Sequence, residues 1–299
     1  MDNIDILLQA PILNVQLLLD GLMIGAIFAL AAYGLALVWG VMNVKNLAQG
    51  DFVIAGGYIG YALAQAGIHP ILALPIAFVV MFGFGWLLYK WVISRVVDRD
   101  LFASLLATFG IAIVLQQVLN LIFGPEVRTA ESGLETLSFA GGLVTVAEIK
   151  LLSFVLAGIL AASIIVFMKR SRMGQAIRAT AQNARAARVL GIDTERVYAF
   201  TFALNAAICG AAGVLVVMIW VIQPYFGIVY AVRAFIIVVA AGLGNMPGVI
   251  VAGLLLGAAE QFSGFILGAE FQVASVVGML LAVLVWRQMQ QARLRQALQ

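Results

Sequence analysis

The chain contains long stretches without a single charged side chain. The stretch 21–44 has 24 residues, 101–125 has 25 and 151–168 has 18, while 52–89 and 197–232 extend over 38 and 36. A helix that crosses a bilayer needs about 20 apolar residues, so each of the two longest stretches can hold a pair of helices. The pattern predicts a protein that crosses a membrane several times.

Composition excludes the main alternatives to a membrane protein. Hydrophobic residues make up 64% of the chain and charged residues 10%, against about 45–50% and about 25% in soluble domains. Too little charge remains to cover the surface of a soluble enzyme. A net charge of +3 spread over 299 residues also argues against a nucleic-acid-binding protein. The single cysteine, Cys209, lies in an apolar run and can form no disulfide within the chain.

The predicted fold class is all-α, a polytopic membrane helical bundle. Further apolar segments near 228–243, 249–267 and 271–286 bring the candidate helices to nine. Backbone groups in hydrocarbon must be satisfied internally, and runs of about 20 residues favour helices over the short alternating strands of a barrel. We expect one transmembrane domain over residues 1–299, with eight to ten transmembrane or half-spanning helices.

The distribution of basic residues predicts the orientation. The segment from Lys169 to Arg196 holds seven Lys and Arg but two acidic residues, so we expect it to be cytoplasmic. The C-terminal tail, with Arg287, Arg293 and Arg295, is expected on the same side. The segment 124–150 is acidic and is expected to be external, as is the N-terminus. Because the N-terminus has no basic region, no cleavable signal peptide is predicted. The acidic residues of 124–150 are Glu126, Glu131, Glu135 and Glu148.

The cytoplasmic segment 169–197 is rich in Ala and Arg, which are good helix formers. Its predicted helix is bounded by Gly174 and Gly191 and places Arg178, Gln182 and Arg185 on one face. The small or uncharged residues of the other face are Ala176, Thr180, Asn183, Ala187 and Leu190. A short helix between two spans can transmit a push from a soluble partner. The alternative is a solvated basic loop that only sets the topology.

Uncharged polar residues inside the apolar stretches are candidates for a solute pathway. Thr108, Gln116 and Asn120 can share a broad stripe of one helix, and Asn205 lies inside another. Such groups either bond weakly to a passing solute or hold helices together at about 0.6–2 kcal/mol each.

Three charged residues lie within or next to the predicted spans, where ionisable groups are functional candidates. Glu260 interrupts an apolar helix and either lines a passage or bonds to a neighbouring helix. Arg233 is expected to extend to the outer interface. Asp20 is interpreted as a cap or an anchor.

The segments Asn43–Asp51 and Gly242–Gly248 interrupt apolar helices with Asn and Gly. Interrupted helices mark binding or gating regions in transporters, so Asn46 and Gln49 join the candidate pathway residues. The second segment is better explained as a tight turn. His69 with Pro70 is also interpreted as a turn, because His69 has no second His and no nearby Cys with which to form a metal site. GxxxG pairs, which allow close helix crossing, occur at Gly21/Gly25, Gly56/Gly60, Gly253/Gly257 and Gly264/Gly268.

Several motifs resemble permeases of the branched-chain amino acid ABC transporters, in family order from about residue 17 to 286. Arg185, Ala186, Ala187 and Gly191 reproduce the Glu-Ala-Ala, three residues, Gly spacing of the ABC-importer permease loop, with Arg at the Glu position. The matching stretches are Ala29–Leu35 with Asn43–Phe52, Leu106–Gly110, Arg178–Thr180 with Ala186–Ile192, and Ala234–Phe235 with Gly242–Gly248, Gly253, Gly257 and Glu260.

The resemblance implies a permease subunit of an importer in a bacterial inner membrane. Its partners would be a second homologous permease, two cytoplasmic ATPase subunits and a periplasmic binding protein, and its solute a branched-chain amino acid. Arg178, Arg185, Ala186, Ala187 and Gly191 would form the segment that docks on an ATPase. This chain would bind no cofactor, and the partner subunits would use ATP and Mg. The sequence has no Gly-Lys pair and therefore no phosphate-binding loop of its own.

Three alternatives remain. A secondary transporter or channel for a small polar solute shares the composition but needs no ATPase-docking helix. Related permeases carry urea-like amides or small organic acids. An intramembrane enzyme is the weakest alternative, because metal signatures such as H-E-x-x-H are absent and a Ser–His dyad would depend on His69.

Overall fold

A computed structural model describes residues 2–97, 101–130, 136–139, 144–242 and 244–297, and nearly all of these are helical. The long helices are α2 (Pro11–Met42), α3 (Gln49–Gln65), α4 (Pro70–Trp91), α5 (Leu101–Phe123), α6 (Glu148–Arg170), α9 (Thr194–Ile219), α10 (Gly227–Ala241), α11 (Met246–Leu267) and α12 (Gln272–Ala297). The short elements are α1 (Asp2–Gln9), α7 (Arg172–Gln182), α8 (Ala184–Val189), the 3-10 turns η1 (Ile93–Arg95), η3 (Pro224–Phe226) and η4 (Ala269–Phe271), and strands β1 (Thr136–Phe139) and β2 (Val144–Ala147).

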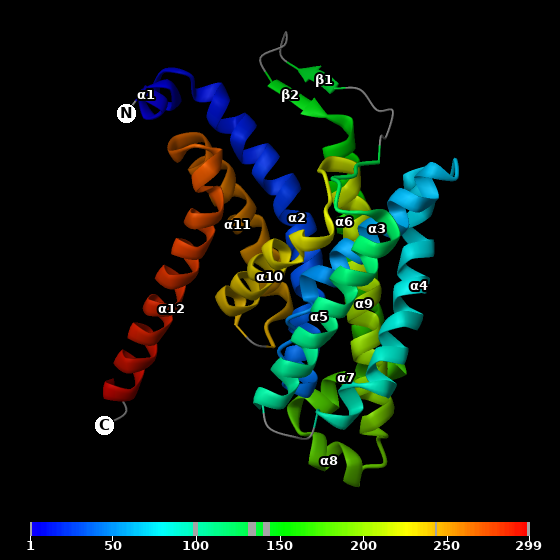
Figure 1. The fold of residues 1–299 in the computed structure, drawn as a ribbon. Helices are drawn as coiled ribbons and strands as arrows, with labels where there is room; N and C mark the ends of the chain where they lie inside the picture. Colours follow the sequence, from blue (N-terminus) through cyan, green and yellow to red (C-terminus); the bar gives the residue numbers. More distant parts are fainter. Residues whose placement is uncertain (1, 98–100, 131–135, 140–143, 243, 298–299) are drawn as a thin grey trace.

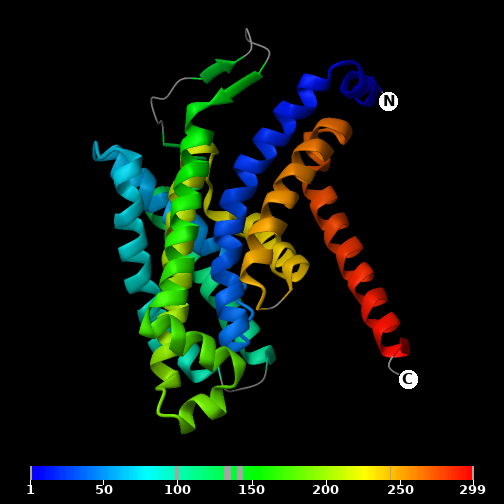
Figure 2. The same ribbon diagram turned by 180° about the vertical axis from the view of Figure 1, so that it is seen from behind.

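The helices form a bundle with two distinct ends (Figure 1). The N-terminus and the antiparallel β1–β2 hairpin, in which Thr136 is paired with Ala147, lie at one end, which we name the hairpin end. Helices α7 and α8 lie at the opposite end, named the α8 end, and α12 runs toward it (Figures 1 and 2). The segment 169–197 and the C-terminus thus lie toward one end and the N-terminus at the other. Glu131 and Glu135 fall outside the described residues, as do the side chains of the basic C-terminal tail.

Two helices form the centre of the bundle. In their most apolar 18-residue windows, α9 and α2 bury 94% and 89% of the residues, whereas α4, α5 and α6 bury 28% or less. A helix that is apolar on all sides belongs in a core or in lipid. The central helices therefore carry the packing, and the outer helices present apolar side chains such as Val79, Leu121 and Ile159 outward.

The all-α membrane bundle expected from the sequence is confirmed. Among the described residues, seven helices are long and apolar enough to cross a membrane: α2, α4, α5, α6, α9, α10 with η3, and α11. Helix α3 has 17 residues, and the apolar part of α12 is confined to 274–286. With α3 and α12 included, nine helices of the described part fall within the expected eight to ten. By length and apolar composition alone, seven of them can cross a membrane. The β hairpin was not expected.

The helix interruptions lie where the sequence placed them. Helix α2 ends at Met42 because Asn43 adopts a left-handed conformation, with φ of 52°, and its backbone N–H donates to the Trp39 carbonyl at 3.1 Å. Helix α10 ends before Gly242, with φ of 89°. The end of α10 and the start of α11 lie near mid-height of the bundle (Figure 1).

Two of the predicted GxxxG pairs cross each other. A Cβ atom at Gly25 would collide with the backbone of Gly253 and Leu254, and one at Gly257 with the backbone of Gly21 and Gly25. Only glycine permits this approach of α2 to α11.

The remaining two pairs differ from each other. Gly56 lies against the backbone of Gly210, so α3 also crosses α9 closely. The prediction for Gly264/Gly268 is wrong, because Gly268 lies beyond the end of α11 with φ of 100°, and a Cβ at this position would approach no neighbouring helix within 4 Å among the described residues.

Candidate functional site

The segment 169–197 folds as two helices rather than the single helix expected. Helix α7 begins at Arg172, where the Ser171 hydroxyl accepts from the Gly174 N–H at 2.8 Å, so Gly174 lies inside the helix and does not precede it. Asn183 leaves the helical conformation, with φ of −158°, and its side chain caps α8 by accepting from the Ala186 N–H at 3.0 Å. The predicted continuous face through Arg178, Gln182 and Arg185 is therefore wrong, because the chain turns between the last two.

Helix α8 presents a small apolar tip at the end of the bundle. Val189 and Leu190 are 84% and 80% exposed, while Ala187 is buried beneath them. Arg185 and Ala186 are exposed on the same short helix. Helical spacing alone places Leu190 on one face with Ala187, so it does not reveal this tip. An exposed pair of large apolar side chains beside arginine is typical of a protein contact surface.

The α8 tip is connected directly to the central helix α9. Arg188 Nε donates to the Thr194 hydroxyl at 2.6 Å, and the Ile192 N–H donates to the Ala187 carbonyl at 3.0 Å. Gly191 makes the turn between the two helices with φ of 84°. Because α9 is almost completely buried, these contacts link the exposed α8 tip to the core of the bundle.

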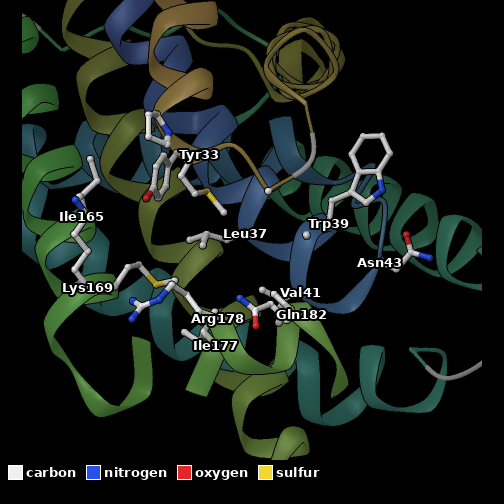
Figure 3. A pocket seen from close by; sticks show the side chains of 16 residues that line it. Tyr33, Leu37, Trp39, Val41, Asn43, Ile165, Lys169, Ile177, Arg178 and Gln182 are labelled. Atoms are coloured by element: carbon white, nitrogen blue, oxygen red, sulfur yellow. The ribbon is translucent and has the colours of Figure 1, made fainter. Parts of the chain in front are cut away.

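An inner cavity of about 750 Å³ lies directly above α7. Helix α7 forms its floor, α2 and α6 form its walls, and the start of α11 closes it from the hairpin side. Figure 3 shows Lys169 and Arg178 on one side of the cavity and Trp39 and Asn43 on the other. Among the described lining residues none is acidic.

Most of the predicted pathway residues lie together in a polar network around the break between α2 and α3. Gln49 Nε2 donates to the Ala31 carbonyl at 2.7 Å, and Gln49 Oε1 accepts from Asn46 Nδ2 at 3.3 Å. The Thr108 hydroxyl accepts from the Leu47 N–H at 3.2 Å, which ties α5 to the break. All of these side chains are fully buried.

One further predicted residue, Gln116, extends this network. Gln116 donates to Asp51 at 2.9 Å, which links α5 to α3. The Nδ2 atom of buried Asn205 and the Oδ1 atom of Asn120 make no hydrogen bond to any residue the structure describes. These residues, like Asn46, Gln49 and Thr108, do not line the inner cavity or the outer cavity described next. Their role in a pathway stays a prediction.

Glu260 and Arg233 form a buried ion pair between α11 and α10. Arg233 Nε donates to the two carboxylate oxygens at 3.2 and 3.1 Å, and an Nη atom donates to one of them as well. The side chains are 5% and 12% exposed. The expectation that Arg233 reaches the outer interface is wrong, because the carboxylate of Glu260 holds it inside the bundle. Asp20 likewise is no cap: it lies within α2 and pairs with Lys150 of α6 at 2.8 Å.

The ion pair faces an outer cavity of about 290 Å³ near the hairpin end. Its wall is aromatic: the guanidinium of Arg233 lies 4.8 Å from the ring centre of Phe28, which stacks on Trp220 at 5.9 Å and meets Tyr230 edge-on. The residues that line it are Ile24, Phe28, Trp220, Val221, Phe226, Val229, Tyr230, Arg233, Glu260, Gln261 and Gln272.

Helix α2 lines both cavities. Ile24 and Phe28 line the outer cavity, while Tyr33, Leu37 and Val41 line the inner one. At about 3.6 residues per turn, the first two residues lie on nearly the opposite side of the helix from the other three. The two cavities therefore border different sides of α2, the outer one toward the hairpin end and the inner one toward the α8 end.

Removing one partner of the Arg233–Glu260 pair is expected to destabilise the bundle strongly. Glu260→Gln leaves a buried cation without compensation, at a cost of about 3–5 kcal/mol, whereas Arg233→Gln with Glu260→Gln removes both charges and should recover most of the loss. Thermal unfolding of the purified chain in one detergent measures both variants. Asp20→Asn with Lys150→Gln, which neutralises the other pair inside the bundle, is the control. Equal stability of the single and double variants would contradict the expectation.

The chain is similar to known proteins over nearly its whole length. The family described as "Branched-chain amino acid transport system / permease component" matches residues 17–286. The high-affinity branched-chain amino acid transport system permease protein BraD of Pseudomonas aeruginosa is 29% identical over 290 residues, covering 91% of this chain and 93% of BraD. The corresponding permease protein LivH of Escherichia coli is 30% identical over 287 residues, covering 90% of this chain and 92% of LivH.

A second permease protein from the same organism is also similar. LivM of Escherichia coli is 26% identical over 287 residues, covering 87% of this chain and 66% of LivM. No solved structure matches the chain.

Proposed function

This chain belongs to the branched-chain amino acid transport system permease family, and we propose that it is the membrane-spanning permease subunit of an ATP-driven ABC importer. Its solutes would be leucine, isoleucine and valine. The observation that carries the proposal is the similarity to BraD and LivH over nine-tenths of this chain. The chain itself would catalyse no reaction and bind no cofactor, since ATP with Mg would be used by partner subunits.

The proposed assembly has two permeases, two cytoplasmic ATPase subunits and a periplasmic binding protein. The similarity to both LivH and LivM supports pairing with a second, homologous permease. The positive charge of the segment 169–197 supports a cytoplasmic α8 end and an external N-terminus in a bacterial inner membrane.

The α8 tip would dock on an ATPase subunit, with Val189 and Leu190 in an apolar groove and Arg185 on its rim. Closure of the ATPase pair would displace α8, and the Arg188–Thr194 bond would pass the displacement to α9. Helix α7, which lies under the inner cavity, would shift with it. The bundle would thus alternate between outward-open and inward-open states, a two-state equilibrium that a nucleotide biases.

Reconstitution tests the proposal. The permease, its second permease and the ATPase subunits are inserted into liposomes that contain ATP, the binding protein is added outside, and radiolabelled solutes are offered singly. We expect uptake of leucine, isoleucine and valine that stops when ATP is omitted. Uptake by this chain without any ATPase subunit would instead indicate a secondary transporter or channel. Uptake of urea or propionate but of no branched-chain amino acid would replace the proposed substrate.

A further inference from the structure

The outer cavity combines features that suit one chemical class of ligand. Charged side chains inside membrane spans are costly and are retained mostly where they pair or line a solute path. Arg233 and Glu260 do both, since they pair with each other and lie in the wall of a cavity. The cavity volume of about 290 Å³ lies just below the range for small-molecule sites, about 300–1,000 Å³, as suits a small solute.

We propose that the Arg233–Glu260 pair is a zwitterion-exchange site for the transported amino acid. The α-carboxylate of the solute takes the place of Glu260 on the guanidinium, and its α-ammonium group pairs with the freed carboxylate of Glu260. The branched side chain lies against Ile24 and Phe28. The inference rests on the proposed function, because it assumes an amino acid as the solute.

Charge balance makes this site selective. A zwitterion inserted between the two partners exchanges one ion pair for two, so no buried charge is left without a counterion. An amine or a carboxylic acid alone satisfies one partner and leaves the other unpaired, which is strongly unfavourable in a desolvated site. Planar guanidinium and carboxylate groups also match each other in a bidentate geometry. A site of this kind recognises the backbone of an amino acid and is tolerant of its side chain.

The aromatic wall suits the ammonium group of the solute, and the existing ion pair keeps the binding weak. Phe28, Trp220 and Tyr230 surround the pair with ring faces and edges, and such rings attract cations. The existing bidentate pair has to open before a solute can enter, so affinity is low. Low affinity suits a site that receives a solute and releases it again.

Trp220 lies in the cavity wall and provides the measurement. The other four tryptophans, at positions 39, 86, 91 and 286, are replaced by phenylalanine, and the permease pair is placed in lipid nanodiscs. Trp220 fluorescence is then titrated with L-leucine, with L-leucine amide, which carries only the positive charge, and with 4-methylpentanoate, which carries only the negative charge. We expect the half-maximal change in Trp220 fluorescence at a leucine concentration at least about 10-fold lower than for either analogue, equivalent to about 1.4 kcal/mol.

Two matched double variants separate a binding role from a structural one. Arg233→Gln with Glu260→Gln keeps the shape of the wall and is expected to abolish the preference for leucine. Asp20→Asn with Lys150→Gln removes a different ion pair, outside the cavity lining, and should leave the preference intact. A merely structural ion pair would give no charge-selective fluorescence response.

The outcomes distinguish this inference from the proposed function. If the assembled complex imports leucine but Trp220 responds equally to all three compounds, or to none, the zwitterion site is wrong and the proposed function stands. A preference for leucine that survives in the Arg233→Gln/Glu260→Gln variant also overturns the site. Failure of the complete complex to import any amino acid overturns the proposed function itself.

Discussion

Gly191→Pro is expected to abolish ATP-driven uptake while the chain still inserts into the membrane. Gly191 has φ of 84°, and its N–H donates to the Arg188 carbonyl at 3.0 Å. Proline fixes φ near −65° and has no N–H, so it fits neither requirement. The turn that positions the exposed Val189 and holds Arg188 on Thr194 is then lost. Because the displacement of α8 no longer reaches α9, ATP hydrolysis and transport become uncoupled.

A matched control is available at the other end of the bundle. Gly67 has φ of 79°, its N–H donates to the Ala64 carbonyl at 3.0 Å, and no atom of another residue lies within 4 Å of the position of a Cβ, as at Gly191. Gly67→Pro therefore causes the same local strain far from α8, and this variant should retain most of the uptake rate.

Initial rates of leucine uptake into proteoliposomes, normalised to the amount of inserted chain, measure the difference. We expect a decrease of about 100-fold for Gly191→Pro, since coupling energies between sites reach about 3 kcal/mol. Deletion of 178–191 should cause the same loss. If uptake survives that deletion, or if Gly67→Pro is as harmful as Gly191→Pro, the coupling role of α8 is wrong.

Much of the fold was predictable because hydrocarbon restricts the backbone to a few solutions. Runs of apolar residues define helices, and Asn or Gly with Pro ends them, so the breaks after Met42 and before Met246 could be located from the sequence. Spacing alone predicted close packing at Gly21/Gly25 and at Gly253/Gly257, but not that these two pairs meet. The hairpin also has a sequence signal, because the segment 136–139 alternates polar and apolar residues.

The site was less predictable because its features depend on contacts between distant residues. Arg233 and Glu260 are 27 positions apart, and only the packing of α10 on α11 shows that they meet. Asn183 has ordinary helical neighbours, so its cap geometry, which divides α7 from α8, is visible only in the structure. The exposure of Val189 and Leu190 contradicts a simple amphipathic pattern because a helix of six residues has too few positions to bury one face.

Gly257→Val is expected to disrupt the contact of α2 with α11 and to destabilise the fold. The added Cβ would overlap backbone atoms of Gly21 and Gly25, which cannot move aside as a flexible side chain can. Overpacking a well-packed core costs about 1–3 kcal/mol and occasionally more, and an overlap with backbone belongs at the upper end of this range. Residues of α2 and α11 line both cavities, so the loss of this contact should also remove uptake.

Gly83→Val provides the control for this substitution. Gly83 lies inside α4, and no atom of another residue lies within 4 Å of the position of its Cβ. Both variants carry the same helix-propensity change, so their difference isolates the helix crossing. For a chain of this size about 3 kcal/mol corresponds to roughly 6–12 °C in melting temperature. Fluorescence-detected size exclusion after heating should show that loss for Gly257→Val and little change for Gly83→Val. Equal melting temperatures of the two variants would mean that the close approach of α2 and α11 is not required for the fold.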